Sequence, residues 1–374
     1  CSSDDLGLNK SAVIADATGG LGSTEVTVAK SSVGLEVGSS TVRLATVSRS
    51  RSGSVIEHLN SIGLNPGVVV DGEVVDAEAL SGAIRHLVKV GKPGGKDVRL
   101  GVASQRMVAR QVDLPWVPPK EFKQALPLLA ADMLPMPVQD CVLDFLSYED
   151  LVDDDGAHVI RGLLVAANEQ SVLDTVDAVE SAGLRVVSVT LTPLSTLGAL
   201  ADPLSPNPEA LLDIGHTMTS ISIHEGGQPR FVRILSRGGQ DITAKLAEHL
   251  SIDEEDAERW KLSLPVTWPT MNAADQSATE TAMRTALADL VSDIRTSIDF
   301  YATSEGRRPG RAYVVGGAGA TLGLLPILAS VLRIPVAVGT PHVTRHGKSM
   351  SADELAMAGS PASASAVGLA LGAA

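Results

Sequence analysis

The sequence predicts an α/β protein with two similar domains around a shared cleft. Apolar segments typical of strands alternate with helical segments along most of the 374 residues, which is the pattern of α/β folds. The stretch GLEVGSSTVRLATV, residues 34–47, has a counterpart in LLDIGHTMTSISI, residues 211–223. Both read as a strand, an acidic residue, a glycine, a hydroxyl-rich turn and a second strand. We therefore expect one such unit in each half of the chain.

Charge and composition exclude several classes of protein. The formal net charge is −14, with 44% hydrophobic and 20% charged residues, which is ordinary for a soluble protein and unfavourable for binding a nucleic-acid backbone. The two cysteines, Cys1 and Cys141, show no C-x-x-C spacing, so neither a disulfide framework nor a zinc site is expected. No apolar run reaches the roughly 18 residues that span a bilayer. We expect a soluble or peripheral protein that binds no nucleic acid and meets a membrane only through partners.

The start of the chain differs in character from the rest. Residues 1–30 are rich in Ser, Gly, Asp and Ala with weak periodicity, which predicts a flexible N-terminal arm. The chain begins with Cys1 rather than Met, which we interpret as the start of a fragment; a processed bacterial lipoprotein also begins with Cys.

The first domain is expected over residues 31–205. Its predicted elements are strands near 33–37, 41–47 and 68–70, a helix over 76–90 and a strand over 98–104. Asp76 is placed as the N-cap of the helix. Residues 112–190 then read as helix, hairpin, helix and strand, with the acidic turn Asp153–Asp155 inside the hairpin, and we interpret them as an inserted subdomain.

The second domain is expected over residues 206–341, after a proline-rich junction. Its predicted elements are the second strand pair, a turn at Gly238–Gly239, an acidic helix over 253–261, a long amphipathic helix over 276–303, and strands that start at Ala312 and Ile334. Residues 342–374 are expected to form a loop and a small-residue helix that returns to the first domain.

The two hydroxyl-rich turns have the chemistry of a phosphate site. A strand that ends in small residues exposes consecutive backbone N–H groups with no bulky side chain before them, and such a nest binds phosphate. In the first turn Gly38 permits the bend, and Arg43 is close enough in sequence to reach a phosphate oxygen. The hydroxyl donors are Ser39, Ser40 and Thr41. One such turn is usually an ordinary hairpin, whereas the matched pair indicates a polyphosphate held from both sides.

The acidic residue near the end of each first strand indicates a metal. Glu36 and Asp213 would face each other across the cleft if the two units are related by pseudo-twofold symmetry. Two facing carboxylates beside a triphosphate can hold Mg²⁺, usually through water. The expected metal beside the polyphosphate is therefore Mg²⁺.

A third glycine turn is expected near the adenosine. Its glycines, Gly316, Gly317 and Gly319, permit a close approach of the backbone to a ligand. Neither common nucleotide motif is complete in this chain. Leu322 replaces the third glycine of G-x-G-x-x-G, and His342 replaces the first glycine of a Walker A loop.

With these three turns in this order, the chain resembles the actin/Hsp70/sugar-kinase ATPase superfamily over about residues 31–372. Within it, the chain is similar to the PilM family of type IV pilus assembly proteins, which are related to the division protein FtsA. The resemblance is carried by GLEVGSSTVRLATV, MLPMPVQDCVLDF, LLDIGHTMTSISIHEGGQPRFVRILSRGGQDIT with EEDAERWK, and VVGGAGATLGLLPILASVLRIPVAV followed by ASAVGLALGAA. It implies an actin/Hsp70-like ATPase fold with an FtsA/PilM-type inserted subdomain.

The turns and the resemblance together give a set of expected nucleotide-binding residues. They are Gly38, Ser39, Ser40, Thr41 and Arg43 in the first turn, Asp213, Gly215, Thr217 and Thr219 in the second, Gly239, the Glu-x-x-Lys pair Glu258 and Lys261 that matches an adenosine-contacting pair, and Gly316, Gly317 and Gly319. Two positions depart from the superfamily, since Glu36 stands where Asp is expected and His216 stands where actin has a second acidic residue. We expect nucleotide binding with at most a weak ATPase activity, and we assign no catalytic residue.

The resemblance implies an actin-like, ATP-binding scaffold of type IV pilus assembly in the cytoplasm, at the inner face of the cell membrane. The inserted subdomain would dock the cytoplasmic N-terminal peptide of a PilN-like inner-membrane protein, and the chain could self-associate. Three alternatives stay open: an FtsA-like division protein, a small-molecule kinase of the same superfamily, and a degenerate actin-like interaction module that binds no nucleotide. The tail after Ala364 contains no Lys or Arg, unlike the basic amphipathic helix of FtsA-like proteins.

Overall fold

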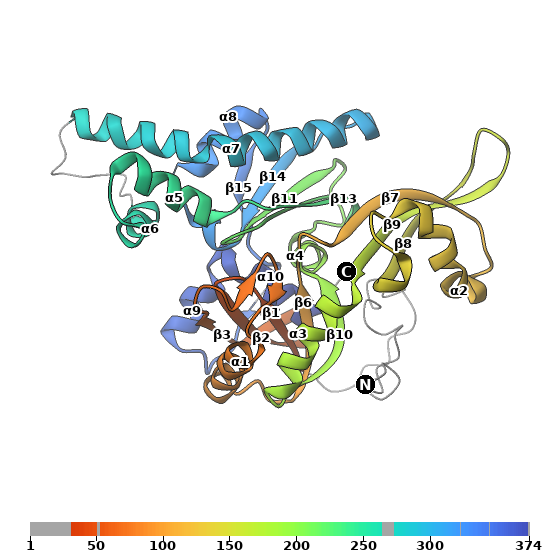
Figure 1. The fold of residues 1–374 in the computed structure, drawn as a ribbon, viewed down its shortest axis with the longest axis horizontal. Coiled ribbons are helices and arrows are strands. Elements are labelled where there is room, and N and C mark those ends of the chain that lie inside the picture. Colours follow the sequence, from red (N-terminus) through yellow and green to blue (C-terminus); the bar gives the residue numbers. More distant parts are fainter. Residues whose placement is uncertain (1–30, 51–52, 264–272, 322, 344, 373–374) are drawn as a thin grey trace.

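The computed structural model describes residues 31–50, 53–263, 273–321, 323–343 and 345–372, and its two main sheets lie on either side of α4 (Thr192–Leu200) and α10 (Ala364–Leu371) (Figure 1). α10 packs against the sheet of domain I and against α4, and α4 contacts strands of both sheets. The expected N-terminal arm, residues 1–30, lies outside the described residues.

Domain I is built on a six-stranded sheet in the order β10-β6-β1-β2-β3-β16. The strands are β1 (Ser31–Val37), β2 (Thr41–Ser50), β3 (Gly53–Gly63), β6 (Asp97–Val102), β10 (Arg185–Leu191) and β16 (Arg345–His346). β1 pairs antiparallel with β2 and parallel with β6. A small hairpin of β4 (Val69–Val70) and β5 (Glu73–Val74) precedes α1 (Ala77–Gly91). Asp76 caps α1 as expected, because its side chain accepts a hydrogen bond from the Ala79 amide at 2.9 Å.

Domain II repeats this topology in a five-stranded sheet of order β13-β12-β11-β14-β15. The strands are β11 (Glu209–Ile214), β12 (Thr219–Glu225), β13 (Gln228–Leu235), β14 (Arg311–Val315) and β15 (Val336–Val338). β11 pairs antiparallel with β12 and parallel with β14, just as β1 pairs with β2 and β6. The two units expected from the sequence therefore sit at equivalent places in two sheets that share an order of five strands, to which β16 adds a sixth in domain I.

Helices cover the sheet of domain II and form its core. They are α5 (Gly239–Leu250), α7 (Ala273–Glu305) and α8 (Leu324–Leu332). Leu287, Leu290 and Ile294 of α7 are buried in the same apolar cluster as Leu212 and Ile221 of the sheet. The long helix expected over residues 276–303 thus belongs to the core.

A small three-stranded sheet projects from one side of domain I (Figure 1). Its strands are β7 (Val108–Pro115), β8 (Cys141–Val152) and β9 (His158–Asn168) in the order β7-β9-β8, with α2 (Pro119–Ala130) packed on them. Val112, Leu126 and Leu164 contribute to its own apolar cluster. β8 and β9 form the hairpin that was expected around Asp153–Asp155.

The limits of this subdomain differ from the expected residues 112–190. The small sheet begins with β7, which starts at Val108, and ends with β9 at Asn168. α3 (Glu169–Ser181) packs against α1, and β10 pairs parallel with β6 at the edge of the large sheet, so both belong to domain I. A parallel partner lies far away along the chain, and the local pattern around β10 gives no sign of it. The inserted subdomain therefore comprises residues 108–168.

The C-terminal segment packs on domain I. β16 pairs with β3, and α9 (Ala352–Ala358) contacts the same strand. Ala366 and Ala370 of α10 share a buried cluster with Ala45 and Val47 of β2. Within the described part of the chain, no helix combines the length and the apolar character needed to cross a membrane.

Candidate functional site

The two expected turns have the same geometry. The Gly38 amide donates to the carbonyl three residues later at 3.0 Å, and the Gly215 amide does the same at 2.9 Å. Each bond closes the turn between two antiparallel strands, β1 and β2 or β11 and β12. The glycine amides are therefore used within the turns and are not available to a ligand.

The two turns meet at one cavity between the domains. Thr217 Oγ1 donates to Ser39 Oγ at 2.9 Å, which joins the tips directly. The cavity has a volume of about 300 Å³. The expected residues that line it are Glu36, Gly38, Ser39, Ser40, Thr41, Arg43, Asp213, Gly215, Gly239, Glu258, Lys261, Gly316 and Gly317. Residues from both halves of the chain thus form one site.

Three of the expected residues, Thr217, Thr219 and Gly319, are not among those that line the cavity. Thr217 meets the site through its hydrogen bond to Ser39. Thr219, the first residue of β12, is fully buried, and its Oγ1 has no partner among the described residues. Side chains alternate along a strand, so Thr219 faces away from the cavity while its neighbour Ser220 lines it. Gly319 lies behind the third turn, where a Cβ would be 3.2 Å from Val314 Cγ1. The structure therefore places neither Thr219 nor Gly319 in the wall of the cavity.

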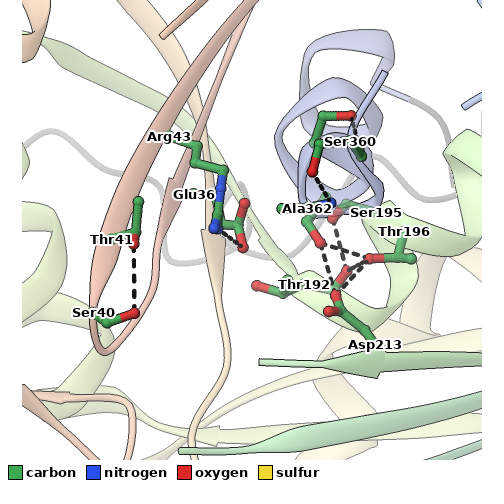
Figure 2. A network of polar contacts seen from close by, with 12 residues as sticks. Glu36, Ser40, Thr41, Arg43, Thr192, Ser195, Thr196, Asp213, Ser360 and Ala362 are labelled. Atoms are coloured by element: carbon green, nitrogen blue, oxygen red, sulfur yellow. Dashed lines mark hydrogen bonds and ion pairs between the residues drawn. The ribbon is translucent and has the colours of Figure 1, made fainter. Parts of the chain in front are cut away.

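The carboxylates of Glu36 and Asp213 lie in the cavity wall, one from each domain. Glu36 Oε1 accepts a hydrogen bond from Arg43 Nη1 at 3.4 Å, whereas the buried Glu36 Oε2 has no partner in the described structure (Figure 2). Burial raises the pKa of Glu36 to about 7; Arg43 opposes this rise and the negative charge of Asp213 adds to it. Burial also raises the pKa of Asp213.

Asp213 is held by two helices whose contact with it was not predicted from the sequence. Ser365 Oγ of α10 donates to Asp213 Oδ2 at 2.9 Å, and Thr196 Oγ1 of α4 donates to the same oxygen at 3.3 Å. The two hydroxyl oxygens also lie 2.8 Å apart, so one of the two protons is shared between the carboxylate and the other hydroxyl. These contacts fix the carboxylate of domain II on the helices that lie between the domains.

The third turn closes against Asp213. Gly316 has φ 85°, and a Cβ there would lie 2.5 Å from Asp213 Oδ1, so only glycine fits this position. A Cβ on Gly317 would be 3.9 Å from Arg43 Nη2. The Arg43 side chain, which starts from domain I, therefore reaches across the cleft to the third turn.

The start of α5 and the helix α6 (Glu254–Ser263) form a further wall. The Gly239 amide donates to the Gly215 carbonyl at 2.8 Å and ties α5 to the second turn. Lys261 is almost completely buried, and its Nζ donates to Glu258 Oε2 at 2.6 Å, Thr243 Oγ1 at 2.8 Å and the Gly239 carbonyl at 3.0 Å. Lys261 therefore holds α6 against the start of α5. The partly exposed Glu258 is the residue of the pair that can contact a ligand.

Several lining residues were not expected from the sequence. They are Thr192, His216, Met218, Ser220, Ile234 and Leu262, with Val37, Gly72, Ala103 and Ala318. The pKa of His216 is lowered by burial and by the positive charge of Lys261, so the imidazole is neutral near pH 7. The position of His216 in the second turn, between Gly215 and Thr217, was the sequence signal that could have identified it as a lining residue.

The residues of the site can hold a Mg²⁺ ion that keeps several of its waters. They do not supply enough side-chain ligands to coordinate the ion completely. Among the described residues, no group of three or more His, Cys, Asp and Glu side chains is placed to hold a metal. Mg²⁺ in nucleotide sites keeps several waters and takes one or two carboxylates together with phosphate oxygens. Glu36 and Asp213, with the unpartnered Glu36 Oε2, match that donor set.

The sequence matches the family described as Type IV pilus assembly protein PilM over residues 34–374. The chain belongs to this family. The resemblance seen in the sequence is thus confirmed over nearly the whole chain.

Solved structures agree with the assignment to the PilM family. The structure described as a PilM-PilN type IV pilus biogenesis complex has a TM-score of 0.77 at 26% identity, over 91% of this chain and 97% of that chain. The ethanolamine utilization protein EutJ from Carboxydothermus hydrogenoformans has a TM-score of 0.55 at 16% identity, over 92% of this chain and 90% of that chain, and shows the fold alone. The expected actin-like α/β fold is confirmed.

The division protein FtsA is a more distant relative. FtsA of Bacillus subtilis is 25% identical over 240 residues, which cover 57% of this chain and 54% of FtsA. FtsA of Enterococcus hirae is 23% identical over 268 residues, which cover 65% of this chain and 60% of FtsA. The chain therefore spans between half and two thirds of the length of these curated relatives.

Proposed function

We propose that this chain is an ATP-binding scaffold of type IV pilus assembly. The observation that carries the proposal is the meeting of two equivalent turns, one from each domain, at a single cavity with two carboxylates in its wall. A ligand held by both turns ties the two domains together. Membership in the PilM family supplies the cellular setting.

ATP with Mg²⁺ is the ligand that suits this cavity. The amides at Ser39–Ser40 and His216–Thr217 would face the polyphosphate, and Arg43 would add positive charge. Mg²⁺ would be held through water by Glu36 and Asp213, where it would neutralise phosphate charge. The adenosine would lie between Glu258 and the third turn.

Binding rather than turnover is the activity that we assign to the site. Asp213 Oδ2 already accepts hydrogen bonds from two hydroxyls, Thr196 and Ser365, so it is a poorly placed base for a water. Hydrolysis is expected to be weak at most.

Isothermal titration and thermal unfolding with Mg-ATP test the nucleotide proposal. A ligand at about a hundred times its dissociation constant stabilises a fold by roughly 2.7 kcal/mol, so a matching rise in melting temperature is expected. Asp213→Asn removes the charge at nearly constant size and should weaken binding by about tenfold or more, whereas Glu255→Gln, an exposed change on α6, should bind like the wild type. No heat and no stabilisation at millimolar Mg-ATP would favour the degenerate, nucleotide-free reading.

The partner that we propose is a PilN-like inner-membrane protein, docked through its cytoplasmic N-terminal peptide on the inserted subdomain. The support is the similar PilM-PilN complex and the exposed apolar side chains of this subdomain: Leu128 is 81% exposed, Val152 71% and Trp116 44%. A chain docked in this way would lie in the cytoplasm at the inner face of the membrane.

A PilN N-terminal peptide titrated into the protein tests the partner proposal. Leu128→Ser should weaken peptide binding severalfold because it removes apolar contact area. Leu204→Ser is the matched control, since Leu204 is 87% exposed and lies outside the inserted subdomain. Equal affinities of the two variants would place the peptide elsewhere.

A further inference from the structure

Two hydrogen-bonded contacts join the domains around the cavity. The inner contact is made by Asp213 of domain II, whose Oδ2 accepts from Thr196 Oγ1 of α4 (Figure 2) and from Ser365 Oγ of α10. Because α10 packs on the sheet of domain I, this contact ties domain II to domain I. The tip contact is made between the two turns, where Thr217 Oγ1 donates to Ser39 Oγ at 2.9 Å.

The inner contact is held more firmly than the tip contact. Asp213 Oδ2 accepts from two hydroxyls, and both come from helices whose residues are almost all buried. The tip contact is one hydrogen bond between two hydroxyl groups, and both residues lie in irregular turns and are half-buried. A hydrogen bond of this kind shifts an equilibrium by about three- to tenfold. The tip contact is therefore the one that can open while the inner contact stays formed.

The tip contact leaves no space for a phosphate group between the turns. A phosphate oxygen that accepts from both hydroxyls makes two O–H···O bonds of about 2.7 Å, which places the hydroxyl oxygens about 4.5 Å apart. In the structure they are 2.9 Å apart, so the turns must separate by about 1.5 Å before one phosphate can contact both. The cavity volume of about 300 Å³ also lies at the lower end of the range for pockets that hold drug-sized ligands.

The side chain of Arg43 crosses the same gap. Its Nη1 donates to Glu36 Oε1 at 3.4 Å within domain I, and its Nη2 approaches Gly317 in the third turn of domain II. Among the described residues, the Arg43 side chain has no other hydrogen bond or ion pair. It therefore lies across the opening that a polyphosphate would occupy, and its one long bond leaves it able to turn toward a phosphate.

We propose that the Thr217–Ser39 hydrogen bond is an autoinhibitory latch, which keeps the turns too close for a polyphosphate and opens before Mg-ATP binds, an inference that rests on the proposed function. With the inner contact formed, domain II moves about α4 and α10, and the two tips separate. Only molecules with an open latch bind nucleotide, so the apparent affinity is reduced in proportion to the open fraction. Bound nucleotide then replaces the direct contact of the tips with a contact through its phosphates.

The association rate constant of Thr217→Val tests the latch. Valine has nearly the size of threonine and cannot donate to Ser39, so a larger fraction of molecules has an open latch. Association of the fluorescent analogue mant-ATP with Mg²⁺ should be about threefold faster or more. Thr296→Val, the same change at an exposed site on α7, should bind like the wild type. If Thr217 were only a phosphate ligand, the variant would associate at the wild-type rate and dissociate faster, which would overturn the latch.

A disulfide between the two tips gives a second test. The pair Ser39→Cys/Thr217→Cys is made in a chain whose natural cysteines, Cys1 and Cys141, are replaced by Ser. Because the two hydroxyl oxygens are 2.9 Å apart, mild oxidation should join the new cysteines through an S–S bond of about 2.0 Å. The oxidised protein should not bind Mg-ATP at concentrations that saturate the reduced protein, and reductant should restore binding.

The outcomes separate the latch from the proposed function. Equal binding of Mg-ATP by the oxidised and the reduced protein, or failure of the pair to form a disulfide, would overturn the latch and leave the proposed function intact. Should the reduced cysteine pair bind poorly, the association rate of Thr217→Val decides. Absence of Mg-ATP binding both to the wild type and to Thr217→Val would overturn the latch and the proposed function together.

Discussion

The Glu36 carboxyl has an electrostatic environment that makes the fold sensitive to pH. Its folded pKa of about 7 lies above the ordinary value of 4.5, chiefly because the group is buried. A carboxyl whose pKa is raised by folding stabilises the protein while it is protonated, and the stabilisation is lost as the pH rises through the folded pKa. Asp213, whose pKa is also raised, acts in the same direction.

In Mg²⁺-free buffer, the free energy of unfolding of the wild type should therefore fall between pH 5 and pH 8. The part due to Glu36 is on the order of 3 kcal/mol, and urea titrations at several pH values measure it. Glu36→Gln cannot lose a proton and should show a clearly shallower decrease. If the free energy of unfolding fell equally with pH in the wild type and in Glu36→Gln, the raised pKa of Glu36 would be wrong.

The residues of the site were predictable where the signal is local. Gly38, Gly215 and the hydroxyls beside them stand in short stretches that determine a turn, and these turns lie where the sequence predicts them. Thr219 was included because the side-chain alternation of β12 was not applied to it, and the structure places its side chain away from the cavity. Ser365 could not be found from the sequence, since it lies 152 residues from the carboxylate that it contacts.

At the scale of elements, two helical glycines differ in their surroundings: Gly368 lies at a close contact between helices, and Gly82 does not. A Cβ on Gly368 of α10 would lie 1.9 Å from the Ser195 carbonyl oxygen of α4, whereas a Cβ on Gly82 of α1 would have nothing within 4 Å. The backbones of α4 and α10 are therefore in direct contact, and a methyl group at Gly368 forces them apart.

Gly368→Ala should lower the free energy of unfolding by about 3 kcal/mol or more, at the upper end of the usual cost of overpacking. Gly82→Ala should raise it by about 0.5–1 kcal/mol, because alanine favours a helix over glycine. Urea unfolding of both variants measures the difference. If Gly368→Ala proved as stable as Gly82→Ala, the close approach of α4 and α10 would be wrong.

Elements defined by local signals were predicted well, and those defined by distant partners were not. The helix capped by Asp76 and the hairpin around Asp153–Asp155 are present where expected. β3 was missed because polar residues such as Glu57, His58 and Asn60 interrupt its apolar pattern. β10 was assigned to the wrong unit, because its pairing with β6 is not visible in the residues around it.

At the scale of the whole molecule, the matched strand order of the two sheets explains why the same turn occurs twice. Each sheet presents its turn after the first strand of the central hairpin, and the two sheets lie on either side of α4 and α10. The turns of the two domains consequently meet at the cavity rather than on separate surfaces. A ligand that bridges them would change how firmly the domains are joined, so under the proposed function the protein could respond to ATP without hydrolysing it.

Amide hydrogen exchange at the two turns, with and without Mg-ATP, tests the central claim most directly. A polyphosphate held between the domains should slow exchange at residues 38–41 and at residues 215–218 together, because amides of both turns then donate to it. Slowing at one turn only, or at neither under saturating Mg-ATP, would contradict a ligand shared by the two domains.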